Sequence, residues 1–81
     1  MLKLSIIIVI KIVNMNIFAQ RLKELRLENN LSQNQLSKQL GISQAAINKW
    51  EKSIIIPTLD SAVLVAKFFG VSIDYLAGLE D

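Results

Sequence analysis

The 81-residue chain contains no cysteine and no histidine. These absences exclude a disulfide framework, a zinc finger and a cysteine nucleophile, and they remove the residue that most often serves as a general base. With only three glycines and one proline among 52% hydrophobic residues, the chain is also too apolar for a disordered linker. Because the chain is shorter than the usual domain of roughly 100 to 150 residues, we expect one compact unit with a single core.

The acidic residues do not suggest a catalytic or metal site. Those of the C-terminal part lack the paired spacing of an acid-base or metal centre; they are Asp60, Asp74, Glu80 and Asp81. The chain also has no Gly-rich phosphate loop. We therefore expect no enzyme, no cofactor, no metal ion and no small-molecule substrate.

Charge is unevenly distributed along the chain, although the net charge is only +2. Residues 20–52 include six basic and three acidic residues, whereas residues 53–81 include one basic and four acidic residues. A domain polarised in this way can present one face to a polyanion and turn the other face away.

Residues 1–14 differ in composition from the rest of the chain. They are rich in β-branched residues, and Lys11 interrupts their apolar run well short of the roughly 20 residues that a transmembrane helix needs. Three interpretations remain: sequence upstream of a native start at Met15, an edge strand that pairs with a second copy, or a secretory signal without a clean cleavage site. We favour the start at Met15 and expect a helical domain over residues 15–81, with no membrane association.

The hydrophobic residues after Met15 follow the period of α-helices, so we expect an all-α fold of five helices. Ser32 and Gln35 form an S-x-x-Q capping box at the start of the second helix, and Gly41 ends that helix. The other expected boundaries are Asn29 and Asn30 after the first helix, Ser43 and Lys52 around the third, Thr58 and Gly70 around the fourth, and Ser72 before the fifth. On the first four helices and their turns, the residues expected to face inward are Phe18, Leu22, Leu25, Leu36, Leu40, Ile42, Ala46, Ile47, Trp50, Leu59, Ala62, Val63, Ala66 and Phe69.

The second and third helices are separated by a tight turn that starts at Gly41, which is the pattern of a helix-turn-helix. In this geometry the second helix of the domain crosses the phosphate backbone of DNA, and the third helix enters the major groove. The outward residues of the third helix in this chain are suited to contacts in that groove, and they are Gln44, Ala45, Asn48, Lys49 and Lys52. Gln and Asn match adenine, Lys donates to guanine, and Ala packs on the thymine methyl group.

Residues Leu31–Glu51 match the string LSQ-x-x-L-[AS]-x-x-x-G-[IV]-S-x-x-x-I-x-x-W-E almost position by position, and Gly70–Gly78 match GVS-x-D-Y-L-x-G. With these motifs the chain closely resembles the Xre/Cro family of helix-turn-helix DNA-binding domains, which includes lambda repressor-like phage repressors. The resemblance covers about residues 18–81. It implies a five-helix lambda repressor-like fold that binds double-stranded DNA sequence-specifically, normally as a homodimer on a palindromic operator.

The resemblance also implies roles for individual residues. Gln33 falls at the family's phosphate-contacting glutamine and Gln44 at its leading base-reading position, and the other groove-facing positions are Ala45, Asn48 and Lys49. Apart from the resemblance, we also expect contacts to the DNA backbone from Ser32, Ser43 and Lys52. Arg26 and Glu51 match a family ion pair that ties the first helix to the end of the third, where we expect a partly buried, orienting role. Trp50 lies on the Ile47 face, so we expect it to pack in the core rather than to stack on a base.

The loop after the third helix departs from the family pattern of a polar turn, often Asn-Gly with basic residues. It contains Ser53, followed by Ile54, Ile55 and Ile56. Serine in place of glycine strains a left-handed helix stop by roughly a kcal/mol. The isoleucine side chains cannot bind phosphate, which favours weaker DNA binding or an apolar patch for a partner.

The sequence therefore predicts a cytoplasmic transcriptional regulator, a homodimeric repressor that reads its operator through the third helix. The alternative is a protein-interaction module, such as an antitoxin or the partner of an anti-repressor, that docks a toxin or another chain through its isoleucine loop or apolar N-terminus. The two interpretations are compatible, since antitoxins of this family bind both DNA and a toxin.

Overall fold

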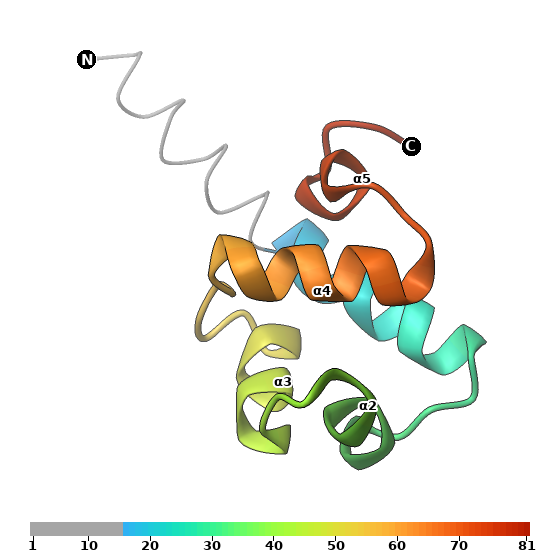
Figure 1. The fold of residues 1–81 in the computed structure, drawn as a ribbon. Coiled ribbons are helices and arrows are strands. Elements are labelled where there is room, and N and C mark those ends of the chain that lie inside the picture. Colours follow the sequence, from blue (N-terminus) through green and yellow to red (C-terminus); the bar gives the residue numbers. More distant parts are fainter. Residues whose placement is uncertain (1–15) are drawn as a thin grey trace.

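The computed structural model describes residues 16–81, and every regular element among them is a helix (Figure 1). In chain order these are a first helix over residues 16–28, α2 (Gln33–Leu40), α3 (Gln44–Glu51), α4 (Leu59–Phe69) and α5 (Ile73–Ala77). The predicted all-α fold of five helices is confirmed for this part of the chain. The three interpretations of residues 1–14 concern residues outside the described range.

Short local motifs set the helix boundaries. The hydroxyl of Ser32 accepts a hydrogen bond from the backbone N–H of Gln35 at 3.0 Å, and the Gln35 side chain accepts one from the backbone N–H of Ser32 at 2.8 Å. The predicted capping box is therefore present. Side-chain caps also begin the three later helices, at the predicted Ser43, Thr58 and Ser72.

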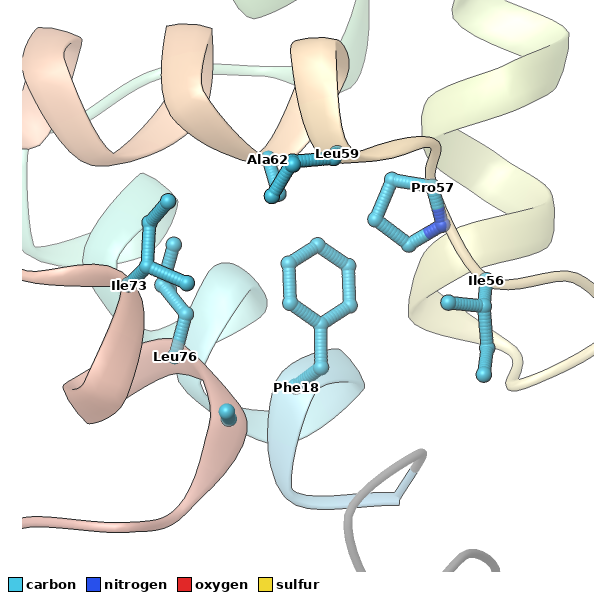
Figure 2. A pocket seen from close by; sticks show the side chains of 8 residues that line it. Phe18, Ile56, Pro57, Leu59, Ala62, Ile73 and Leu76 are labelled. Carbon is cyan, nitrogen blue, oxygen red and sulfur yellow. The ribbon is translucent and has the colours of Figure 1, made fainter.

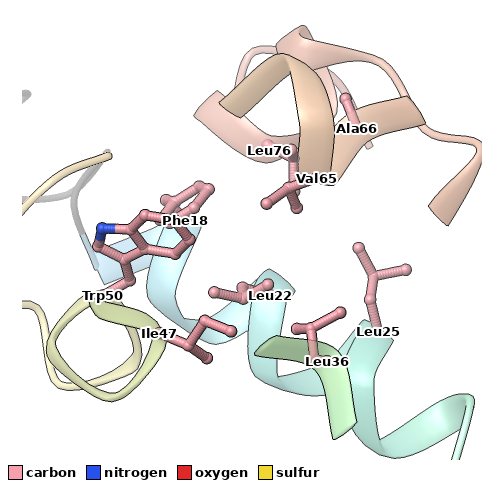
Figure 3. Close-up of a cluster of buried hydrophobic side chains, with 9 residues drawn as sticks. All are labelled: Phe18, Leu22, Leu25, Leu36, Ile47, Trp50, Val65, Ala66 and Leu76. Carbon is pink, nitrogen blue, oxygen red and sulfur yellow. The ribbon is translucent and has the colours of Figure 1, made fainter. Parts of the chain in front are cut away.

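One hydrophobic core joins all five helices of the described chain (Figure 3). Its buried members are Phe18, Leu22, Leu25, Leu36, Ile47, Trp50, Val65, Ala66 and Leu76. The ring of Trp50 meets that of Phe18 edge to face, with 6.3 Å between the ring centroids. Trp50 is only 4% exposed, so its predicted place in the core is confirmed.

The prediction for α4 was wrong at two positions. Leu59 was expected to face inward, yet it is 70% exposed, whereas Val65 was not expected in the core and is completely buried. Leu59 is the first residue of α4, directly after the Thr58 cap. The helical period predicts which face of a helix points inward, but it does not predict where the neighbouring helices end. Leu59, at the end of its helix, was misplaced for this reason.

Leu59 instead lines an apolar pocket of about 220 Å³ (Figure 2). Phe18 projects into this pocket from the first helix, between Pro57 on one side and Leu76 on the other. The remaining lining residues are Ile56, Ala62, Ile73 and Ala77. The pocket thus lies where α4, α5 and the loop after α3 meet the first helix.

Arg21 fastens α5 to the first helix. Its guanidinium lies 4.2 Å from the centroid of the Tyr75 ring and donates hydrogen bonds to the backbone carbonyls of Tyr75 and Glu80. Beside this contact, Gly78 has a φ of 82°, and a Cβ added to it would lie 2.8 Å from Cδ1 of Ile17. A side chain at this position would strain the backbone and would have to displace the side chain of Ile17.

The stop of α3 is strained as predicted, because Ser53 has a φ of 58° in the left-handed region. The backbone N–H of Ile54 donates to the carbonyl of Lys49 at 2.9 Å, and that of Ser53 donates to the carbonyl of Trp50 at 3.1 Å. These bonds satisfy the last carbonyls of the helix. A non-glycine residue holds this conformation at a cost in free energy.

We expect Ser53→Gly to raise the free energy of unfolding by about 0.5 to 1 kcal/mol, because glycine adopts a positive φ without a Cβ clash. Urea denaturation followed by tryptophan fluorescence measures the change. The same substitution in the right-handed first turn of α4, Ser61→Gly, is the matched control and should lower stability by a similar amount. A loss of stability in Ser53→Gly would contradict the strain.

Candidate nucleic-acid interface

The turn between α2 and α3 is fixed by its own hydrogen bonds. Gly41 ends α2 in the left-handed conformation, with a φ of 66°. The backbone N–H of Ile42 then donates to the carbonyl of Ser37 at 3.2 Å, and the Ser37 hydroxyl donates to the carbonyl of Ile42 at 2.5 Å. Ile42 itself packs against the core. Figure 1 shows α2 and α3 on the side of α4 opposite to α5.

The outer face of α3 has no part in the core. Ile47 and Trp50 point inward, whereas Gln44, Ala45 and Lys49 are exposed and Asn48 is half-buried. Lys52, also exposed, follows as the C-terminal cap. At 100° per residue, the face from Gln44 to Lys52 spans an arc of about 140°. The structure therefore brings the predicted base-reading residues together on one surface.

The two predicted serine contacts to the DNA backbone are helix caps in the structure. Ser32 and Ser43 are exposed, and each hydroxyl accepts a hydrogen bond from its own helix, from Gln35 at 3.0 Å and from Ala46 at 3.1 Å. Each hydroxyl proton is still able to donate to an anion. The backbone N–H groups of the first turn of α2 point out of the N-terminal end of the helix, where the positive end of its dipole also favours an anion.

Arg26 and Glu51 form a buried ion pair, with side chains that are 9% and 4% exposed. Nε of Arg26 donates to Oε2 of Glu51 at 2.7 Å, and Nη2 donates to Oε1 at 2.9 Å. A third donor of the guanidinium, Nη1, bonds the carbonyl of Leu31 at 2.8 Å. The hydrogen bond to Glu51 raises the pKa of Arg26, while burial acts in the opposite direction. The first helix is thus bound to the entry of α2 and to the last residue of α3.

Two of the predicted DNA-contacting residues are hydrogen-bonded to each other, which the sequence did not predict. Nδ2 of Asn48 donates to Oε1 of Gln33 at 3.2 Å, and Nε2 of Gln33 donates to Oε1 of Glu51 at 3.2 Å. Only the spacing of Asn48 and Glu51, three residues apart on one helix, pointed to a shared edge of α3. The approach of Gln33 depends on how the turn sets α2 against α3.

The loop after α3 exposes its three isoleucines, with exposed fractions of 59% for Ile54, 42% for Ile55 and 60% for Ile56. The loop begins directly after Lys52, at the end of the outer face of α3.

Over residues 16–81, acidic side chains form no cluster that could hold a metal ion. In the same range, every helix falls short of the length and apolarity needed to cross a bilayer.

Residues 22–76 match a family model described as helix-turn-helix. The transcriptional activator BcrR of Enterococcus faecalis is 42% identical over 79% of this chain, and the regulator MJ0272 of Methanocaldococcus jannaschii is 43% identical over 75% of it. The transcriptional repressor RstR of the cryptic phage CTXphi from Vibrio cholerae is 30% identical over 69% of the chain.

The matched region spans 92% of MJ0272, but only 31% of BcrR and 50% of RstR. No solved structure matches the chain significantly.

We expect Glu51→Leu to lower the free energy of unfolding by about 3 to 5 kcal/mol, because it leaves the Arg26 guanidinium buried without its carboxylate. The double variant Arg26→Met/Glu51→Leu removes both charges and should recover most of that loss. Urea denaturation measures both, and Glu28→Leu, at an exposed position of the first helix, is the control with little expected effect. A double variant as unstable as the single one would contradict the role of the pair.

Proposed function

Since the chain belongs to the Xre/Cro family of helix-turn-helix domains, we propose that it is a sequence-specific transcriptional regulator that binds double-stranded DNA. The observation that carries this proposal is the outer face of α3, where amide and ammonium groups are exposed on a helix backed by the core. An α-helix fits the major groove of B-DNA, and these groups match its base edges.

We assign the two helices different roles on the DNA. The base edges are read from α3 by its reading face, which consists of Gln44, Ala45, Asn48 and Lys49. The start of α2 and the two ends of α3 contact phosphates through Ser32, Gln33, Ser43 and Lys52. Phosphate contacts of this kind set the register of the protein on the duplex, and the base contacts supply the specificity.

We further propose that two copies act together on a palindromic operator and repress transcription. A reading helix of eight residues (Gln44–Glu51) covers only a short half-site, and a two-fold dimer doubles the contacts with half-sites one helical turn apart. RstR is named a repressor and BcrR an activator. Repression needs only occupancy of the operator, which this face supplies directly.

Selection from a randomised duplex pool by the full chain, at fixed salt, tests this function. We expect enrichment of a palindrome whose half-sites lie about 34 to 36 Å apart, or a multiple of that distance. Enrichment of a single half-site would contradict the dimer, and no enrichment at all would contradict sequence-specific binding.

We expect Gln44→Ala to lose about 1 to 3 kcal/mol of binding free energy on the selected duplex and much less on random DNA, because Gln44 is assigned to a base edge. Fluorescence anisotropy with both duplexes measures the two losses. Gln39→Ala, at an exposed glutamine of α2, is the matched control and should change neither. Equal losses on both duplexes would remove Gln44 from base reading.

A second function is favoured by the exposed isoleucine loop beside the apolar pocket. In this case the chain binds a protein partner, such as a toxin or an anti-repressor, through Ile54, Ile55 and Ile56. Neighbouring apolar side chains that are exposed together are typical of a protein interface. The two functions are compatible, because the loop lies beside the reading face rather than on it.

Co-expression with the products of neighbouring genes tests the second function. We expect a neighbouring product to co-purify with the chain, and Ile54→Ser/Ile55→Ser to abolish co-purification because it removes the apolar contact. Lys49→Ala, on the reading face, is the control and should retain the partner. Binding that survives the double serine variant would place the partner elsewhere.

A further inference from the structure

A continuous chain of hydrogen bonds leads from the buried ion pair to the reading face. Arg26 donates to Glu51 at 2.7 and 2.9 Å, Glu51 accepts from Gln33 at 3.2 Å, and Gln33 accepts from Asn48 at 3.2 Å. Gln33 and Asn48 are half-buried, whereas both charged side chains are less than 10% exposed. This series of hydrogen bonds therefore starts in the interior and ends at a residue assigned to base reading.

The charges at the start of this chain fix the direction of every later bond. A guanidinium can only donate hydrogen bonds and an ionised carboxylate can only accept them. Gln33 must therefore turn its amide nitrogen toward Glu51, which leaves its amide oxygen facing Asn48. Because that oxygen is an acceptor, Asn48 must turn its own amide nitrogen toward Gln33.

One arrangement of donors and acceptors is left on Asn48. An isolated asparagine amide can rotate by 180° and exchange its oxygen with its nitrogen. In this series of hydrogen bonds, one N–H of Asn48 donates to Gln33. Its second N–H and its oxygen therefore remain for DNA in a fixed order. Adenine presents the complementary pair in the major groove, with N7 as acceptor and the N6 amino group as donor.

We propose that the Arg26–Glu51 pair orients the amide of Asn48 through Gln33 and thereby makes adenine the base that Asn48 reads. In this arrangement Gln33 and Glu51 are positioning residues for base recognition, in addition to the phosphate contact assigned to Gln33. The adenine assignment rests on the proposed DNA-binding function, whereas the orientation of the Asn48 amide exists in the free protein and can be tested without DNA.

The first experiment uses the full chain, labelled with ¹⁵N, in the absence of DNA. We expect one proton of the Asn48 side-chain amide to exchange slowly with solvent and to respond to Gln33→Met, which keeps the length of the side chain but removes its acceptor. Gln39→Met, at an exposed position of the same helix, is the matched control. An Asn48 amide signal that is unchanged by Gln33→Met would overturn the relay.

The second experiment measures base preference on the duplex that the unchanged chain selects from a randomised pool. At the position read by Asn48, identified as the one whose preference Asn48→Ala abolishes, we expect adenine to be favoured about 5- to 150-fold over other bases. Gln33→Met should reduce this preference at least about fivefold, and it should cause no further reduction in the Asn48→Ala background.

A Gln33 that served only as a phosphate contact would give a different result. Gln33→Met would then weaken binding by the same factor to the four duplexes that differ only in the base at this position. The adenine preference would stay intact, which would overturn the proposal. A preference for a base other than adenine would overturn the assignment of Asn48. A failure to select any duplex would overturn the proposed function and the adenine assignment together, and the amide exchange in the free protein would still decide whether the relay exists.

Discussion

Three helices meet at the guanidinium of Arg26, which binds Glu51 at the end of α3 and the carbonyl of Leu31 just before α2. A charge at this depth is tolerable only because its donors are matched by a carboxylate and a carbonyl. The core beneath sets how far apart the helices lie, while these directed bonds set how α2 and α3 are rotated. Since the residues that we propose to read bases lie on α3, their position relative to the first helix depends on this pair.

Below the ion pair, apolar packing supports the turn from the other side. Leu36 of α2 and Ile47 of α3 are both completely buried, and Ile42 packs against the same core from the turn between them. Because buried side chains interdigitate closely, the angle between the two helices cannot change without opening a cavity. The helix that we propose to read DNA is therefore pre-organised, and binding need not order it at a cost in entropy.

Local features of this fold could be predicted from the sequence, whereas distances between elements could not. The capping box at Ser32 and the left-handed stop at Ser53 each depend on a few adjacent residues, and both are present. Leu59 was misplaced because a helical period does not show where a neighbouring helix ends. The contact between Gln33 and Asn48 was missed for a related reason, since it depends on the rotation of α2 against α3. The ion pair between Arg26 and Glu51 was expected only from the family resemblance.

The modest charge of the reading side has a consequence for specificity. Phosphate contacts by lysine and arginine supply nearly all non-specific affinity for DNA, and here the exposed lysines of α3 and its cap are only Lys49 and Lys52. The isoleucine loop that follows adds apolar surface where the family has polar residues, so it contributes little attraction to phosphate. Fewer phosphate contacts lower the affinity for all DNA sequences alike, so the preference among sequences comes from the base contacts. In the proposed complex with DNA, discrimination between sequences therefore rests on the base-reading amides, whose orientation we assign to the ion pair beneath α3.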